Sequence, residues 1–92
     1  MELVSKLRRV LPDEAVIIKN DPNSVQGYPD LSIHYNGKYV LLEVKRKKGA
    51  PEQPNQRYYI EQACRNTYAA FVYPENMEEV INEVQRTFTP LG

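Results

Sequence analysis

Apolar residues near the start of the chain recur with the period of an α-helix. The i, i+4, i+7, i+8 spacing of one helical face is formed by Leu3, Leu7, Val10 and Leu11. Pro12 ends this pattern, so residues 2–11 are predicted to form a short amphipathic helix. Residues 15–19 then read as a β-branched strand, and a cluster of turn-forming residues predicts a loop over 20–27.

A hairpin is predicted where Asn36-Gly37 separates two apolar runs, because a two-residue type I′ turn needs positive φ at both positions. If these are the two loop residues, Tyr35 faces Lys38. The facing pairs are then 33 with 40, 31 with 42, and 30 with 43.

This register predicts that Asp30 faces Glu43 on one side of the sheet, where opposite Cβ atoms are about 4.5–5.5 Å apart. Two like charges in that position are unfavourable. Lys45 follows Glu43 on the same side by the period of two. The other side is expected to form the core, through Leu31, Ile33, Val40, Leu42 and Val44.

The second half of the chain predicts a helix over 56–67 with Gln56 at the front of its inward stripe, then a strand over 68–73. Asn76 and Glu79 resemble a capping pair for a last helix. Its apolar face is Met77, Val80, Ile81, Val84 and Phe88. Because a strand, a crossover helix and another strand imply parallel pairing, the fold class is α/β, with the order α-β-β-β-α-β-α and a mixed sheet.

The totals predict a single small domain covering residues 1–92, in which 12 basic and 12 acidic residues cancel. Attraction to nucleic acid would therefore depend on the local basic cluster 45–48. The single cysteine, Cys64, lies among helix core positions and is expected to act as a small hydrophobe. No apolar run suits a signal peptide or a membrane span, so a cytoplasmic protein is expected.

The facing acids suggest a metal site. A divalent cation between Asp30 and Glu43 would offset their repulsion, and Mg²⁺ prefers oxygen ligands while keeping waters that a phosphate can replace. Such an ion can lower the pKa of a bound water, and Lys45 can steady the charge that builds on the phosphoryl oxygens. This chemistry is phosphodiester hydrolysis.

The segments GYPDL at 27–31 and LEVKRKKG at 42–49, followed by Gln56, resemble the PD-(D/E)XK nuclease superfamily and, within it, the virus-type replication-repair nuclease domain, VRR-NUC. The resemblance covers about residues 2–84. It implies a restriction-endonuclease-like core. It also implies metal ligation by Asp30 and Glu43, by the carbonyl of Val44 and by Glu2, with Glu14 as the alternative to Glu2. Lys45 would be the catalytic cation, and Gln56 would help position Lys45 or a phosphate.

The same resemblance implies a Mg²⁺- or Mn²⁺-dependent endonuclease acting on branched or flapped DNA, similar to Holliday junction resolvases and homodimeric like them. The DNA-binding candidates are Arg46, Lys47 and Lys48. A bacterial or phage-encoded protein would fit this activity.

Structural interpretations of the same residues remain open. Asp30 could cap a turn, Glu43 could lie on an exposed strand edge, and Gln56 could be an ordinary first-turn helix residue. The basic run could be a solvated face. A nucleic-acid-binding module without cleavage and a purely structural dimerisation domain are the alternative functions. His34 is expected on the surface near the hairpin tip. Asn20 could approach the metal site from the preceding loop, but a role in forming that loop is the expectation.

Overall fold

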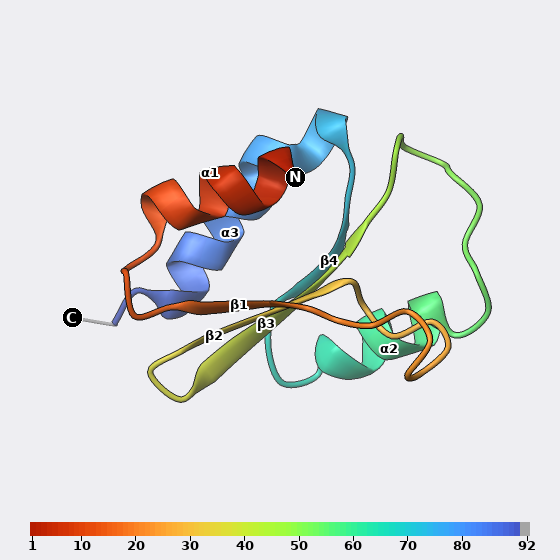
Figure 1. The fold of residues 1–92 in the computed structure, drawn as a ribbon, viewed down its shortest axis with the longest axis horizontal. Coiled ribbons are helices and arrows are strands. Elements are labelled where there is room, and N and C mark those ends of the chain that lie inside the picture. The colour runs from red at the N-terminus through yellow and green to blue at the C-terminus, as the bar shows by residue number, and fades with distance from the viewer. Residues whose placement is uncertain (91–92) are drawn as a thin grey trace.

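The computed structural model describes residues 1–90, and their helices and strands follow the predicted order (Figure 1). A short 3-10 helix, η1, is inserted before the last helix. The elements are α1 (Glu2–Val10), β1 (Val16–Lys19), β2 (Leu31–Tyr35), β3 (Lys38–Val44), α2 (Gln56–Ala63), β4 (Ala69–Val72), η1 (Pro74–Asn76) and α3 (Met77–Phe88). None of the helices in this part of the chain is long and apolar enough to cross a membrane.

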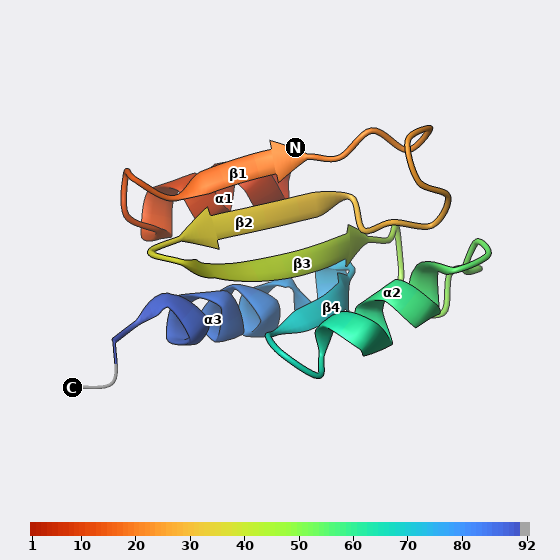
Figure 2. The same ribbon diagram turned by 90° about the horizontal axis from the view of Figure 1, so that it is seen from below.

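The four strands form one mixed sheet in the order β1-β2-β3-β4 (Figure 2). β2 is antiparallel to both of its neighbours, and β4 is parallel to β3, as the crossover through α2 predicts. Asn36 and Gly37 both have positive φ, at 52° and 78°, as the two-residue turn requires. The predicted hairpin register is confirmed: Leu31 pairs with Leu42, Ile33 with Val40 and Tyr35 with Lys38.

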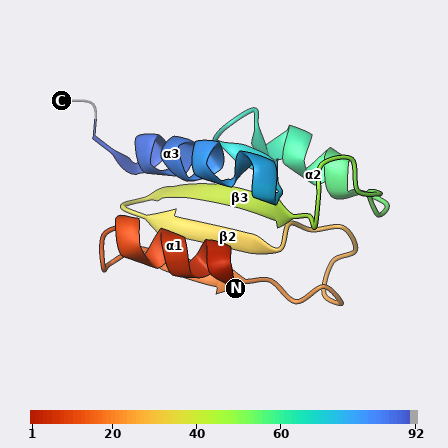
Figure 3. The ribbon, with the colours of Figure 1, turned by 90° about the horizontal axis from the view of Figure 1, so that it is seen from above.

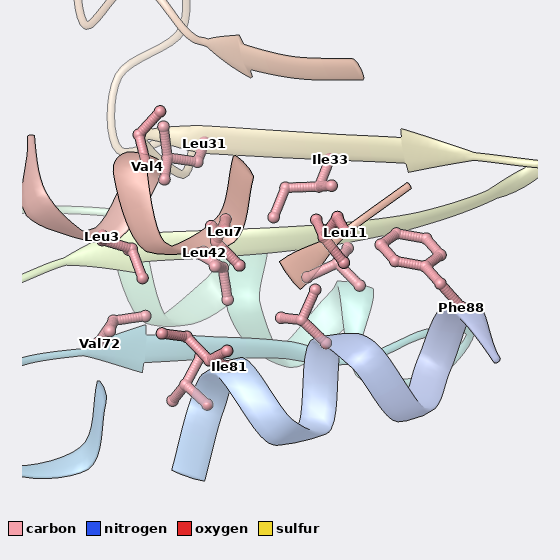
Figure 4. Close-up of a cluster of buried hydrophobic side chains, with 13 residues drawn as sticks. Leu3, Val4, Leu7, Leu11, Leu31, Ile33, Leu42, Val72, Ile81 and Phe88 are labelled. Carbon is pink, nitrogen blue, oxygen red and sulfur yellow. The ribbon is translucent and has the colours of Figure 1, made fainter. Parts of the chain in front are cut away.

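Helices cover the two faces of the sheet unequally. α1 and α3 lie side by side on one face, whereas α2 alone lies on the other (Figures 1 and 3). The main core fills the space beneath α1 and α3 (Figure 4). Its strand residues are Leu31, Ile33, Val40, Leu42 and Val72. The predicted inward face of the hairpin is therefore the core face.

A smaller core lies beneath α2 and contains Leu41, Ile60, Ala63 and Ala69. Alternation along β3 turns Leu41 and Glu43 toward this helix, while Leu42 between them faces the main core. Glu43 and Gln56 are both buried on this side. The thinner layer therefore holds the charged and amide side chains that the sequence singles out.

Three local predictions are corrected. Val10 is 42% exposed, because the buried stripe of α1 runs through Leu3, Val4 and Leu7 instead. Cys64 is exposed, since α2 ends at Ala63 rather than near residue 67. Asn76 makes no side-chain cap to α3. Its amide instead accepts from the N–H of residue 73 and donates to the carbonyl of residue 71, fastening the end of β4.

Candidate active site

Four of the predicted site residues come from three segments that meet at one end of the sheet. Asp30 precedes β2, Glu43 lies near the end of β3, Lys45 directly follows β3, and Gln56 is the first residue of α2. Figure 2 shows this meeting of the end of β3 with the start of α2. The hairpin and the crossover are therefore the two features that assemble the site.

Asp30 directly precedes Leu31, the first residue of β2, which pairs with Leu42. The same register therefore places Asp30 opposite Glu43. Its carboxylate turns toward the backbone of β3, where Oδ2 accepts from the N–H of Val44 at 2.8 Å. The N–H and C=O of a strand residue point to the same neighbour, so the Val44 carbonyl faces this side as well. Asp30 and Val44 also line one open hollow of about 340 Å³, which gives solvent a route to the Asp30 carboxylate.

Glu43 is only 4% exposed, although it carries a carboxyl group. Burial and then the negative charge of Asp30 raise its pKa from 4.5 to about 7, while Lys45 acts in the opposite direction. Oε1 of Glu43 is buried without a hydrogen-bond partner among residues 1–90. An unpartnered buried carboxylate oxygen is costly, so this atom calls for a proton or a cation.

Gln56 links this acid to the lysine. Its Nε2 donates to Oε2 of Glu43 at 2.8 Å, and its Oε1 accepts from Nζ of Lys45 at 2.5 Å. Oε1 also accepts from the backbone N–H of Gln53 at 2.9 Å. The opposite amide orientation would turn an NH₂ group toward the ammonium, so these partners define which end faces which residue. Gln56 is thus a buried bridge and not an ordinary first-turn residue.

Lys45 is anchored by further contacts. Its Nζ donates to the carbonyl of Pro51 at 3.1 Å and lies 5.9 Å from the ring centroid of Phe71. The backbone N–H of Lys45 also donates to the carbonyl of Val72 at 2.7 Å, which extends the pairing of β3 with β4 by one residue. The ammonium is therefore held by side chain, backbone and ring, in a defined position next to the two acids.

Two loops brace each other beside the site at Gly27. This residue has φ of +81°, and a Cβ added to it would lie 2.2 Å from the carbonyl oxygen of Pro54 and 2.9 Å from Asn55. Only glycine fits both the backbone conformation and the close approach. The loop that leads to Asp30 is thereby packed on the loop that leads to Gln56.

Glu2 is not brought together with the two acids. No set of three or more His, Cys, Asp or Glu side chains among the described residues could hold a metal ion. Glu2 is exposed at the start of α1, and it is its neighbour Met1 that lines the Asp30 hollow. Glu14 lies at the other end of the sheet, in a hollow with the hairpin turn. The site of this structure therefore contains two carboxylates and not three.

Two further residues are where the sequence predicts them. His34 pairs with Tyr39 near the hairpin tip, with ring centroids 6.5 Å apart, and takes no part in the site. The Asn20 amide donates at 2.8 Å to both the carbonyl of Pro29 and Oγ of Ser32. It closes the base of the loop that presents Asp30.

The basic run divides into two parts. Arg46, Lys47 and Lys48 are all exposed. Lys47 and Lys48, with Lys45, line a cleft of about 380 Å³ next to the site, whereas Arg46 is not part of its lining. The predicted DNA-binding cluster therefore adjoins the acids through Lys45.

Comparisons with protein-family models, with curated proteins and with solved structures found no match for this chain. Function therefore has to be inferred from the residues of the site. Their donor set suits a hard divalent cation, because Mg²⁺ is commonly held by one or two carboxylates, with waters and substrate phosphates completing its shell. The buried, unpartnered Oε1 of Glu43 beside Asp30 is the observation that supports this fit.

The cleft also contains three residues that the sequence motifs did not reveal. Arg57 and Glu52 form an ion pair in which both Nε and Nη2 of the arginine donate to the carboxylate. The same guanidinium lies 5.0 Å from the ring centroid of Phe71. Phe71 pairs with Glu43 across the parallel strands, so a correct register for β4 would have revealed its position. No sequence signal indicated the partner of Arg57.

Proposed function

We propose that this chain is a Mg²⁺- or Mn²⁺-dependent endodeoxyribonuclease with a restriction-endonuclease-like core. The observation that carries the proposal is the buried Glu43 carboxyl, whose Oε1 has no partner in residues 1–90 although Asp30 adjoins it. A stable domain gains nothing from two facing acids in that state. A cation that binds both would turn this cost into a function.

Each residue of the site has a role in this chemistry. Asp30 and Glu43 would hold the ion, with the carbonyl of Val44 as a further ligand. When bound, the ion would polarise a phosphodiester oxygen and lower the pKa of a water ligand. The ammonium of Lys45 would stabilise the negative charge that develops on the phosphoryl oxygens, and Gln56 would keep that ammonium beside the acids.

The expected substrates are branched or flapped DNA, cut by a homodimer in the manner of Holliday junction resolvases. Exposed Lys47 and Lys48 would contact the DNA backbone next to the site, and Arg46 would add charge at its margin. A twofold pair of such domains would present two sites to opposing strands.

The direct test is cleavage of labelled linear, flapped and four-way DNA with Mg²⁺, with Mn²⁺ and with EDTA. We expect cutting with either metal only, and at least a hundredfold loss, about the effect of removing one electrostatic group, in Lys45→Ala. Lys38→Ala, which removes an exposed lysine from the hairpin, is the matched control and should cut normally. Undiminished cutting in EDTA would contradict the proposal.

A second candidate is a nucleic-acid-binding module that does not cleave. It is favoured by one observation: with a pKa of about 7, Glu43 can resolve its conflict with Asp30 by keeping a proton. Isothermal titration with Mg²⁺ and Mn²⁺ separates the two candidates. Binding that Glu43→Gln removes supports the nuclease, whereas no binding at millimolar metal supports the module.

A further inference from the structure

The cleft beside Lys45 has the size and lining of a nucleotide site. Its volume of about 380 Å³ is toward the lower end of the roughly 300–1,000 Å³ typical of small-molecule sites. It therefore has room for one nucleotide. Four cationic side chains line it, namely Lys45, Lys47, Lys48 and Arg57, against the single carboxylate of Glu52.

Aromatic side chains form another part of the lining. Phe71 and Tyr73 both border the cleft. The Phe71 ring already carries the Arg57 guanidinium, so Tyr73 is the ring on which an unpaired base would stack, as bases do in single-strand binding proteins. The amide of Asn76 also borders it and is held in place by two backbone partners. A cationic surface beside aromatic rings suits a single strand of any sequence.

The guanidinium of Arg57 is already arranged to bind an oxyanion. It rests over Phe71, and its Nε and Nη2 both donate to Glu52, with the Nε bond at 3.0 Å. The planar fork that grips a carboxylate with two bonds grips a phosphate in the same way. The hydrogen bond from Arg57 lowers the pKa of Glu52, so this carboxylate is ionised and would repel an incoming phosphate.

We infer that the cleft binds one unpaired nucleotide of a DNA strand, with its phosphate on Arg57 in the place that the Glu52 carboxylate occupies in the free protein. Lys45 lines the cleft and bonds to Gln56, which bonds to Glu43, so this nucleotide would be next to the phosphodiester at the acids. This inference rests on the proposed nuclease function. The preferred substrate is then DNA with an unpaired strand at the cut, such as a flap, and not an intact four-way junction.

The test replaces each residue of the Arg57–Glu52 pair in turn. A phosphate site predicts that the two substitutions change DNA binding in opposite directions, whereas a structural ion pair predicts the same effect for both. Binding of a fluorescein-labelled oligothymidylate is measured by anisotropy in EDTA at fixed salt. Arg57→Gln should weaken binding about fivefold, and Glu52→Gln should tighten it about fivefold, as one unit charge at close range does in water. If both variants weaken binding, or neither changes it, the inference is overturned.

A matched pair of controls is available on α3, where exposed Arg86 and half-buried Glu83 form an ion pair at 2.9 Å. Arg86→Gln and Glu83→Gln make the same changes in net charge and should leave binding unchanged. If Glu83→Gln tightens binding as much as Glu52→Gln, the effect is one of net charge and the inference fails. It also fails if a hairpin duplex with equal phosphates binds as tightly as the oligothymidylate, or if inorganic phosphate competes equally well.

Cleavage assays distinguish the failure of this inference from the failure of the proposed function. Oligonucleotide binding in EDTA requires no metal and no cutting. Opposite effects at Arg57 and Glu52 without cleavage of any substrate would support the nucleotide site and refute the nuclease. Metal-dependent cleavage that prefers intact four-way DNA over flaps would support the nuclease and refute the nucleotide site.

Discussion

Replacing Glu43 by glutamine is expected to stabilise the metal-free protein at alkaline pH while removing the proposed nuclease activity. Burial and the neighbouring charge of Asp30 raise the pKa of Glu43 from 4.5 to about 7 in the folded chain. A carboxyl group with a raised pKa contributes its full stability below the unfolded value. This contribution is lost as the pH rises from about 4.5 through about 7.

The size of the effect follows from these two values. Each tenfold change in proton affinity corresponds to about 1.36 kcal/mol, so the wild-type protein loses at most about 3 kcal/mol across this range. The side chain introduced by Glu43→Gln does not titrate, and its carbonyl can still accept a hydrogen bond from Gln56. The free energies of unfolding should therefore differ by up to about 3 kcal/mol at pH 8 and by nearly nothing at pH 4.

Urea unfolding followed by circular dichroism in EDTA at both pH values measures this difference. Glu14→Gln removes an exposed carboxylate far from the site and is the matched control for the loss of one negative charge. Added Mg²⁺ should stabilise the wild-type protein at pH 8 but not Glu43→Gln. Equal stabilities of the wild type and Glu43→Gln at pH 8 would refute a buried, strained carboxylate.

Two further predictions concern the groups around the acids. Gln56→Ala should lower the free energy of unfolding in urea by about 1–3 kcal/mol and slow the proposed DNA cleavage, because it leaves a buried carboxylate oxygen and an ammonium without their shared partner. Gln62→Ala on the same helix should do neither. Gly49→Ala should cost about 1–2 kcal/mol for its positive φ alone. Gly27→Ala should cost about 1–3 kcal/mol more, because its Cβ would also meet the carbonyl of Pro54, and equal costs in thermal unfolding would contradict this packing.

The hairpin and its acids were predictable because local rules determine them. Asn36-Gly37 accepts few turn geometries, the turn defines the register, and the register carries Asp30 opposite Glu43. Gln56 could be assigned to the inward stripe by helical spacing alone. Its hydrogen bonds to both Lys45 and Glu43 could not be predicted, because they depend on the position of α2 relative to the sheet.

Residues whose neighbours are distant in sequence were harder to predict. Cys64 was expected to be buried, but the helix ends one residue before it, where the chain turns toward β4. Glu2 was expected beside the acids, but α1 packs on the other face of the sheet from α2 and leaves this side chain exposed. The contact of Arg57 with Phe71 depends on the register of two parallel strands, which no turn specifies.

The geometry of the candidate site depends on the tight turn at Asn36-Gly37, at the far tip of the hairpin. The turn lies about six strand residues from Glu43, roughly 20 Å away, and is not part of the candidate site. One extra residue there that shifts the pairing of β3 by one position would turn Glu43 toward the hydrophobic core and place a leucine on the side of the site. Insertions at this exposed tip, ordinarily the most forgiving place in a small domain, should therefore be tolerated only in lengths that preserve the pairing.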